Sequence, residues 1–382
     1  MHLATDITGL SFKHRTGIGR ILEELLVRWI AQMEAGRSLI TRMTLLSAVP
    51  PTSEWSKRAE ESRNVALRFS HSPSHYVWRQ TSLGRMARRC GADLLYVHEP
   101  IAPLVCSVPL VCTVNDFFFR DIPENEPWHI LWIYRLIAPP TIRRSAALAC
   151  ISRHTLDRLT HYFPAARLKA RLIYPGCGFA RFQENEKTCA IRDDLRRRHA
   201  LPTAFALFAG VATLRKNIAR IFEALARLRD EGFHLPLVIF GPPSPYAQEC
   251  ARRWNIAPIH TGYLSDEEIA ALYRMAAVLV FPSISEGFGF PIVEAMAAGT
   301  PVVTASTTAT GEIAGDAAHL VNPFSVEEIA AGVRKCVEDT AYASELVRRG
   351  RERALLFDWD RAAAQMVDLF GEALRGTILS HE

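Results

Sequence analysis

The stretch that decides the fold is residues 278–303, VLVFPSISEGFGFPIVEAMAAGTPVV. Its first four residues form a short apolar, β-branched run that is typical of a buried parallel strand. The two glycines of residues 286–290, EGFGF, favour a sharp turn. Pro291 suits the first position of a helix, and Gly299 is placed to end that helix before a second apolar run. The stretch therefore predicts a strand, a glycine loop, a short buried helix and another strand.

This loop leads into a helix N-terminus, where free backbone N–H groups and the helix dipole make a ready anion site. Two carboxylates, Glu286 and Glu294, bracket the loop. We interpret Glu286 as a loop residue and Glu294 as a residue of the first helical turns, both near one bound ligand. The alternative is an ordinary strand-to-helix crossover whose two glutamates are solvated. Spacing alone does not decide between these interpretations.

The sequence EGFGFPIVEAMAAGTPVV resembles the signature of the retaining glycosyltransferases of family 4, and the resemblance extends at lower density over nearly the whole chain. It implies the GT-B fold, an α/β architecture of two Rossmann-like doubly wound domains that face a cleft. In that family two glutamates separated by seven residues contact the sugar donor. By this resemblance Glu286 touches the transferred sugar and Glu294 the nucleotide ribose. The loop residues between them join the predicted donor-binding set: Gly287, Phe288, Gly289 and Phe290.

Composition sets broader limits. At 382 residues, with 49% hydrophobic and 22% charged residues, the chain has an ordinary soluble composition and room for two to three domains. The formal charge of +5 fits anionic substrates or an anionic membrane surface and is too small to argue for nucleic acid. Eight cysteines without a CxxC pair indicate reduced thiols in the cytosol. Because we find no signal peptide and no run of roughly 20 apolar residues, we expect a cytoplasmic protein, either soluble or peripheral on the inner face of the membrane.

The first half of the chain predicts strands near residues 1–7, 39–47, 92–97, 109–114, 147–152 and 171–174. Gly17 and Gly19 precede an apolar-periodic helix at residues 21–31, which by itself is a weak signal for phosphate contact. The G-x-G-R placement resembles the amino-terminal glycine loop of family 4, which faces the donor phosphates. The resemblance therefore adds Gly17 and Gly19 to the donor-binding residues.

Asn115 and Asp116 follow the strand predicted at 109–114, at the carboxyl edge where ligands of open parallel sheets bind. Family 4 members commonly carry His-Asp at this place, with the histidine close to the transferred sugar. By this resemblance Asn115 belongs to the catalytic site. An asparagine can hydrogen-bond a sugar hydroxyl but carries no proton, so the departure puts an acid–base role at this position in doubt.

Residues 76–89 and 128–144 mix aromatic with basic side chains, among them Trp78, Trp128 and Trp132. Such a mixture suits helices that lie on anionic lipid. Two ordinary amphipathic helices with solvated arginines are the alternative. The sequence leaves both interpretations open.

The second half of the chain alternates helical patterns with strands predicted at 205–209, 235–241, 259–263, 277–281, 301–304 and 319–321, which predicts a parallel doubly wound sheet. Arg215 and Lys216 follow the first of these strands at the start of a helix, where two cations suit a diphosphate. A solvated surface pair is the alternative. The R-K-N sequence resembles the pyrophosphate site of family 4 and assigns both residues to it. Val211 stands where some members carry another arginine.

Tyr263 and Leu264 lie in the turn that, by the same resemblance, borders the nucleotide base. Asp358 and Asp360 form a D-x-D sequence, which binds metal in a different glycosyltransferase fold. Here it matches the pattern that precedes the terminal helix of family 4, so we predict no metal site. The predicted domains are an acceptor-side domain at 1–174, a nucleotide-sugar donor domain at 175–360, and a helix at 361–382 that crosses back to the first domain.

The sequence therefore predicts a retaining, metal-independent hexosyltransferase of bacterial polysaccharide or lipopolysaccharide synthesis, with Glu286, Asn115, Arg215 and Lys216 as catalytic residues. It would need no cofactor beyond the nucleotide-diphosphate sugar. The opening D-x-T-x-L and the R-K-N loop look most like mannosyltransferases, which favours GDP-mannose as donor and a saccharide, carried on a polyprenyl lipid, as acceptor. UDP- or dTDP-sugar donors, a GT-B nucleotide-sugar epimerase and a non-catalytic partner subunit stay open as alternatives.

Overall fold

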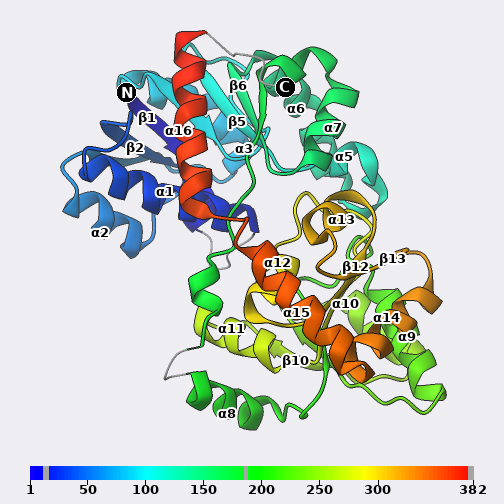
Figure 1. Ribbon diagram of the computed structural model, residues 1–382. Helices are drawn as coiled ribbons and strands as arrows, with labels where there is room; N and C mark the ends of the chain where they lie inside the picture. The colour runs from blue at the N-terminus through cyan, green and yellow to red at the C-terminus, as the bar shows by residue number, and fades with distance from the viewer. Residues whose placement is uncertain (12–16, 185–187, 377–382) are drawn as a thin grey trace. The chain divides into compact units, whose positions relative to one another are not determined.

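The computed structural model describes residues 1–11, 17–184 and 188–376, which form two compact units (Figure 1). The first unit comprises Met1–Pro175 together with the helix that begins at Trp359. The second comprises Gly176–Asp358. The chain therefore leaves the first unit, builds the second, and then returns to the first.

The first unit contains a seven-stranded parallel sheet with the order β3-β2-β1-β4-β5-β6-β7. Its strands are β1 (His2–Asp6), β2 (Arg42–Ser47), β3 (Val65–Phe69), β4 (Leu94–Val97), β5 (Leu110–Val114), β6 (Ala147–Cys150) and β7 (Ala170–Leu172). Six of them lie where the sequence predicts strands. The edge strand β3 is missed because only Val65 is buried, so its sequence lacks the continuous apolar run of the central strands.

Helices complete the first unit: α1 (Gly17–Glu34), α2 (Ser53–Glu61), α3 (His75–Trp78), α4 (Gly84–Arg89), α5 (Phe118–Asp121), α6 (Trp128–Arg144), α7 (Arg153–Tyr162) and α16 (Trp359–Arg375). A π-helical turn, Arg79–Leu83, joins α3 to α4. In Figure 1 the terminal helix α16 lies beside α1, and Trp29 packs edge-on against Tyr96 and Phe370. The Trp29 indole N–H also donates to the Ala363 carbonyl at 3.1 Å. The terminal helix therefore belongs to the core of this unit.

The segment around α3 and α4 corrects one sequence interpretation. Trp78 and Arg79 are 1% and 2% exposed, so neither side chain is available to a lipid surface. The exposed cations of this segment are Arg85, Arg88 and Arg89. Across the described residues of the chain, no helix combines the length and apolarity that crossing a membrane requires.

The second unit contains a six-stranded parallel sheet with the order β10-β9-β8-β11-β12-β13. Its strands are β8 (Ala206–Ala209), β9 (Leu237–Phe240), β10 (Ile259–Gly262), β11 (Val278–Phe281), β12 (Val302–Ala305) and β13 (His319–Val321). Its helices are α8 (Thr188–His199), α9 (Ile218–Asp230), α10 (Pro245–Trp254), α11 (Asp266–Met275), α12 (Phe290–Ala298), α13 (Thr308–Ala314), α14 (Val326–Glu338) and α15 (Thr340–Ala354). All six strands overlap the predicted ones, and the predicted doubly wound sheet is confirmed.

In each sheet the direction in which successive strands are added reverses once, at a topological switch point. In the first sheet the chain runs outward from β1 to β3 and then restarts at β4 on the other side of β1. In the second sheet it runs outward from β8 to β10 and restarts at β11, beside β8. Because the two connections at a switch point leave neighbouring strands in opposite directions, they open a crevice at the carboxyl ends. The loops after β1 and β4, and those after β8 and β11, are therefore where functional side chains are expected.

Candidate functional site

The glycine loop after β11 adopts the predicted strand–turn–helix structure. Gly289 has a φ of 102° and caps the N-terminus of α12, whose first residue is Phe290 and whose second is Pro291. A Cβ on Gly289 would also lie 3.0 Å from Ile292 Cδ1. Gly299, with a φ of 81°, ends the helix as predicted. The sequence predicts Pro291 as the first residue of the helix, whereas it is the second. The left-handed Gly289 lets the helix start one residue earlier, at Phe290.

Glu286 lies in a charged cluster at the switch point of the second sheet. Its carboxylate is 3.1 Å from Arg215 Nη1 and 3.9 Å from Lys216 Nζ, and it accepts a hydrogen bond from the Ser283 hydroxyl at 3.2 Å. Arg215 also donates to the Ser285 carbonyl at 2.9 Å, which ties the loop after β8 to the loop after β11. The side chains of Arg215, Lys216 and Glu286 are 24%, 15% and 12% exposed, so the cluster is accessible but largely dry. The structure thus brings together three of the predicted site residues.

Lys216 is held in place from two further sides. Its ammonium lies 4.9 Å from the centroid of the Phe281 ring, at the end of β11. It also lies so close to Gly210 that a Cβ there would be 2.6 Å from Nζ, and Gly210 has a φ of 111°. The absence of a side chain at Gly210 therefore makes room for the lysine over the carboxyl edge of β8.

Arg215 and Lys216 affect the pKa of Glu286, and Glu286 affects the pKa of Lys216. Burial by itself would raise the pKa of Glu286, but Arg215 and Lys216 outweigh it and hold that pKa below its usual value. Burial lowers the pKa of Lys216, and Glu286 opposes that shift. Glu286 is therefore a carboxylate at neutral pH, and the cluster has two cationic side chains for one anionic side chain.

Glu294 lies in the second turn of α12 and is 6% exposed. Its Oε2 accepts a hydrogen bond from the Tyr273 hydroxyl at 2.8 Å. Glu294 belongs to α12, the helix that the glycine loop after Glu286 leads into. Because Glu286 is 12% exposed and paired with Arg215, and Glu294 is 6% exposed and bonded to Tyr273, the alternative of two solvated surface glutamates is wrong.

The remaining loop residues support the site by packing. Phe288 is 2% exposed and lies between the rings of Phe290 and Phe357, with centroids 5.0 and 5.4 Å away. Its side chain is therefore part of the core, and only its backbone could face a ligand. Gly287 is buried as well.

Tyr263 and Leu264 follow β10, two strands away from β8 in the sheet order. Tyr263 is 58% exposed and Leu264 is half-buried. They border the same carboxyl edge as the charged cluster but lie farther along it. This position fits contact with a part of a ligand distant from its phosphates.

Gly17 and Gly19 belong to the first unit, where the structure differs from the expectation. Helix α1 begins at Gly17, so both glycines lie in its first turn and not in a loop before a helix at 21–31. Gly17 is exposed and Gly19 is buried. Thr16, the first residue of the T-G-I-G-R sequence, lies outside the described residues. The apolar pattern predicted the middle of α1, at residues 21–31, but not its start at Gly17.

Asn115 follows β5 at the carboxyl edge of the first sheet and is 6% exposed. Its side-chain amide donates to the His98 carbonyl at 2.8 Å, which joins the ends of β4 and β5. Within the described residues its Oδ1 is buried and has no hydrogen-bond partner. The asparagine is therefore anchored through its amide nitrogen, and its Oδ1 is available to accept a hydrogen bond from a ligand.

A second charged cluster, which the sequence reasoning missed, lies at the switch point of the first sheet. Arg79 is 2% exposed; its Nε donates to Asp6 Oδ2 at 2.7 Å and its Nη1 donates to Glu99. Glu99 also accepts a hydrogen bond from the Tyr134 hydroxyl at 2.5 Å. Burial opposes ionisation of Glu99, but Arg79 and His98 outweigh it and lower the pKa of Glu99 to about 2. Asp6 is the last residue of β1 and Glu99 lies two residues after β4, and this place near the carboxyl ends of strands is the signal that could have found them; Arg79 offered none.

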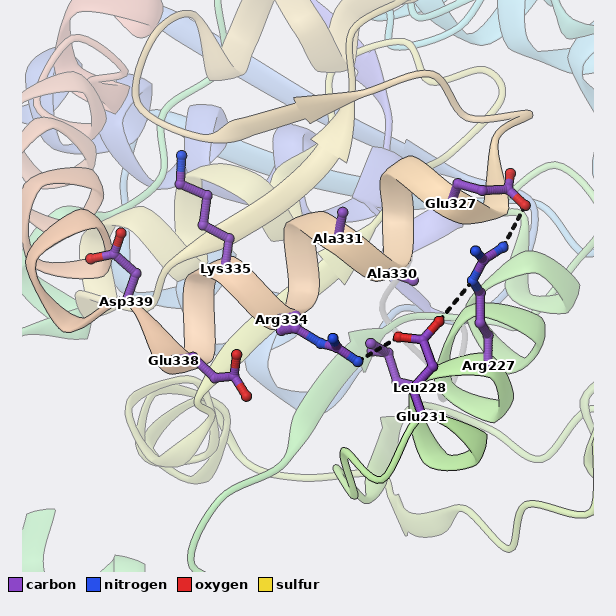
Figure 2. Close-up of a pocket in the computed structure, with 10 residues that line it drawn as sticks. All are labelled: Arg227, Leu228, Glu231, Glu327, Ala330, Ala331, Arg334, Lys335, Glu338 and Asp339. Atoms are coloured by element: carbon purple, nitrogen blue, oxygen red, sulfur yellow. Dashed lines mark hydrogen bonds and ion pairs between the residues drawn. The ribbon is translucent and has the colours of Figure 1, made fainter.

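The second unit also has a groove that is distinct from the charged cluster around Glu286. Figure 2 shows the groove between α9 and α14, with a volume of about 610 Å³. Arg227 bonds to Glu231 and Glu327, and Arg334 bonds to Glu231, so these four charged side chains are paired with one another. The charged cluster around Glu286 lies elsewhere, at the carboxyl edge of the sheet. None of the predicted site residues lines this groove.

Among the described residues, no group of three or more His, Cys, Asp or Glu side chains has the arrangement of a metal site. Beside Glu286, the loop after β8 supplies the cations Arg215 and Lys216, and helices α9 and α12 begin nearby in the sequence at Ile218 and Phe290. These are the elements that bind a phosphate group in proteins.

Comparison with known proteins identifies the family. Residues 42–181 match the family described as Glycosyltransferase Family 4, and residues 192–353 match Glycosyl transferases group 1. A glycogen synthase of Mycobacterium tuberculosis is 30% identical over 295 residues, which is 74% of this chain and 68% of that protein. This chain is a family 4 glycosyltransferase.

A second relative of this glycosyltransferase is the O-antigen chain mannosyltransferase B of Escherichia coli, 31% identical over 175 residues. The match covers 44% of this chain and spans less than half, 45%, of that relative. HepE of Anabaena, solved in complex with UDP and glucose, superposes with a TM-score of 0.74 at 16% identity over 97% of this chain and all of that one. The predictions of family 4 and of the GT-B fold are confirmed.

Proposed function

We propose that this glycosyltransferase is a retaining, metal-independent enzyme that transfers mannose from GDP-mannose to a lipid-linked saccharide during bacterial cell-surface polysaccharide synthesis. The observation that carries the proposal is the cluster of Arg215, Lys216 and Glu286 at the switch point of the second sheet. Two cations and a carboxylate at one place suit a ligand with a negative diphosphate and a neutral sugar.

In this mechanism the protein stabilises the leaving group directly. Arg215, Lys216 and the N-termini of α9 and α12 neutralise the nucleoside diphosphate as the sugar–phosphate bond breaks. They take the place that a divalent cation occupies in other transferases. The pKa of Lys216 is lowered by burial, yet its interaction with Glu286 works to keep the ammonium charged.

The two glutamates hold the hydroxyl groups of the donor. Glu286 accepts hydrogen bonds from the sugar, and Glu294, fixed by Tyr273, accepts them from the ribose. Asn115 offers its Oδ1 as an acceptor for a sugar hydroxyl. We assign no nucleophile: the acceptor hydroxyl attacks on the face that the diphosphate leaves, and the leaving phosphate takes its proton, which retains the anomeric configuration.

The choice of mannose rests on relatives. The Escherichia coli O-antigen relative is named as a mannosyltransferase, whereas the glucose-containing HepE complex shares only the fold. A UDP- or dTDP-sugar donor is the second candidate, since a backbone turn at Tyr263 and Leu264 could accept more than one base. An epimerase of the same fold would release free sugar without an acceptor, and a non-catalytic subunit would have no need for the Glu286 cluster. We place the enzyme in the cytoplasm, at the inner face of the membrane.

A thermal-shift panel of GDP, UDP, dTDP, ADP and their sugars, each with and without EDTA, tests the proposal. We expect GDP and GDP-mannose to raise the melting temperature selectively, and EDTA to leave that rise unchanged. Selective stabilisation by UDP or dTDP would overturn the donor but keep the site. A shift abolished by EDTA would overturn the metal-independent mechanism, and no shift with any nucleotide would overturn the proposed transferase activity.

A further inference from the structure

Helix α6 exposes a stripe of large apolar side chains. Trp128, Trp132 and Leu136 are 73%, 57% and 64% exposed. They are spaced four residues apart, so at about 100° per residue they lie within an arc of about 80° on one face of the helix. Three large apolar residues exposed on a single helix face are unusual for a soluble surface, where such residues are normally scattered.

The opposite face of the same helix accounts for its packing. Tyr134, Ala138, Thr141 and Ile142 are buried against the sheet of the first unit. The fold therefore uses a complete inner face of α6, and Trp128, Trp132 and Leu136 contribute little to it. Their burial must come from a partner if it occurs at all.

The charges beside the stripe indicate which partner fits. Helix α6 contains no acidic residue, and its exposed Arg135 and Arg143 fall on or within about 20° of the arc that carries Trp128, Trp132 and Leu136. Glu124 and Glu126 precede the helix and lie outside it. The outward face is therefore apolar and cationic together.

A loop that exposes further apolar side chains is attached to the C-terminal end of α6. Arg144 donates to the carbonyls of Pro103 and Cys106, and so fastens the loop between them to the helix. That loop exposes Leu104 and Val105, which are 44% and 87% accessible. Exposed apolar residues thus occur at both ends of the helix.

We propose that the outward face of α6, with Trp128, Trp132 and Leu136 inserted and Arg135 and Arg143 at the headgroups, docks the protein on an anionic lipid bilayer. Indole rings favour the interface between headgroups and acyl chains, and arginines reach the phosphates with their long stems in apolar surroundings. A second copy of this chain fits less well, because a two-fold contact would bring the arginines of both copies to one interface.

Docking through α6 also deepens the proposed function and rests on it, because it explains how a lipid-linked acceptor would be delivered. The inner face of α6 is bonded through Tyr134 to Glu99, and through Glu99 and Arg79 to Asp6, at the carboxyl edge of the first sheet. The helix that meets the membrane is thus the helix that carries one wall of the acceptor-side edge. Asn115 lies at that same edge.

Sedimentation with sucrose-loaded vesicles tests the docking surface. We expect the full chain to bind phosphatidylcholine vesicles that contain phosphatidylglycerol, and the double variant W128A/W132A to lose at least about tenfold in partition coefficient. Leu168→Ala, which removes a side chain 68% exposed elsewhere on the same unit, is the matched control and should bind as the native chain does. Equal binding by native protein and W128A/W132A would overturn the proposal, as would native binding to pure phosphatidylcholine that equals binding to the anionic vesicles.

Two further measurements separate this proposal from the others. Sedimentation equilibrium should show no change in oligomeric state for W128A/W132A; a native dimer that the variant dissociates would assign the stripe to a second copy and overturn the membrane proposal. The GDP-induced thermal shift should be the same in W128A/W132A as in the native chain. Loss of vesicle binding with an intact nucleotide shift would support docking through α6, whereas vesicle binding without any nucleotide response would leave docking intact and count against the transferase proposal.

Discussion

The two sheets of this glycosyltransferase place a charged cluster at the same topological position, and the two clusters have opposite compositions. At the switch point of the first sheet one arginine, Arg79, lies between two carboxylates, Asp6 and Glu99. At the switch point of the second sheet one carboxylate, Glu286, lies between Arg215 and Lys216. The first cluster therefore has an excess of negative charge and the second an excess of positive charge. The fold fixes where charges gather, and the residues decide which ligand chemistry they suit.

The clusters differ in exposure as well. Arg79 and Asp6 have side chains 2% and 0% exposed, whereas Arg215 is 24% exposed. A closed cluster stabilises the fold because its charges are satisfied internally, and loss of one member leaves the others buried without compensation. An open cluster can exchange an internal partner for a ligand. The predictions below test this division, from the largest expected effect to the smallest.

Arg79→Met should destabilise the first unit strongly. It leaves Asp6 and Glu99 as buried carboxylates without their cation, which costs about 3–5 kcal/mol of unfolding free energy. Urea denaturation followed by circular dichroism measures the change, with Arg85→Met, an exposed arginine of α4, as the control. A loss below about 1 kcal/mol would show that the first cluster is not structural.

Glu286→Gln should reduce turnover about 10²–10³-fold, because the amide cannot match a carboxylate at the developing charge of the transition state. The dissociation constant of the nucleoside diphosphate should change less than about threefold, since Glu286 is assigned to the sugar. Initial-rate kinetics and calorimetry measure the two effects, with the exposed Glu338→Gln as control. Normal turnover by Glu286→Gln would falsify the site assignment.

Acid should weaken the first cluster over a defined pH range. The folded pKa of Glu99 is lowered to about 2, below its unfolded value of about 4.3, so its contribution is complete above about pH 4.3 and is lost as the pH falls toward about 2. That loss corresponds to about 3 kcal/mol. The difference in unfolding free energy between native protein and Glu99→Gln, measured from pH 7 to pH 2.5, should shrink across this range. A difference that stays constant would contradict the assignment.

Lys216→Ala should weaken binding of the nucleoside diphosphate by about tenfold to a hundredfold, the usual worth of a charge-assisted hydrogen bond. Stability should change by less than about 1 kcal/mol, because Glu286 keeps Arg215 as its partner. Calorimetric titration measures the affinity. Lys335→Ala is the control and should bind the nucleoside diphosphate as the native chain does. Lys335 lies in the groove of Figure 2, with its ammonium 4.1 Å from the centroid of the Tyr342 ring, and is not part of the Glu286 cluster.

The sequence predicted the second cluster better than the first, and the topology explains the difference. Arg215 and Glu286 each follow an apolar strand within a recognisable strand–loop–helix pattern, and the switch between β8 and β11 then brings them together. Arg79 lies 73 residues from Asp6, in a segment whose other arginines are exposed. The local sequence pattern cannot show that Arg79 is the buried arginine of this segment, because its buried partner Asp6 is distant in the sequence.

Helix limits show a similar division. Gly299 ended α12 as predicted because a left-handed residue after an apolar run is a local signal. The start of α1 at Gly17 was missed because glycine is normally a poor helix former, so Gly17 and Gly19 gave no local helix signal. The edge strand β3 was missed because only Val65 is buried, so the strand has no apolar run, and its pairing with β2 is not visible in its own residues.

The return of the chain to the first unit affects the order in which the two units can fold during synthesis. Helix α16 supplies Phe370 to the aromatic group around Trp29 and Tyr96, and the Ala363 carbonyl to the Trp29 indole. A nascent chain that has emerged only as far as Asp358 holds every residue of the second unit but lacks this helix of the first. The second unit can therefore complete its fold on the ribosome before the first, even though the first is translated earlier. During that interval the apolar surface that later receives α16 stays exposed, and such transiently exposed surface is prone to aggregation.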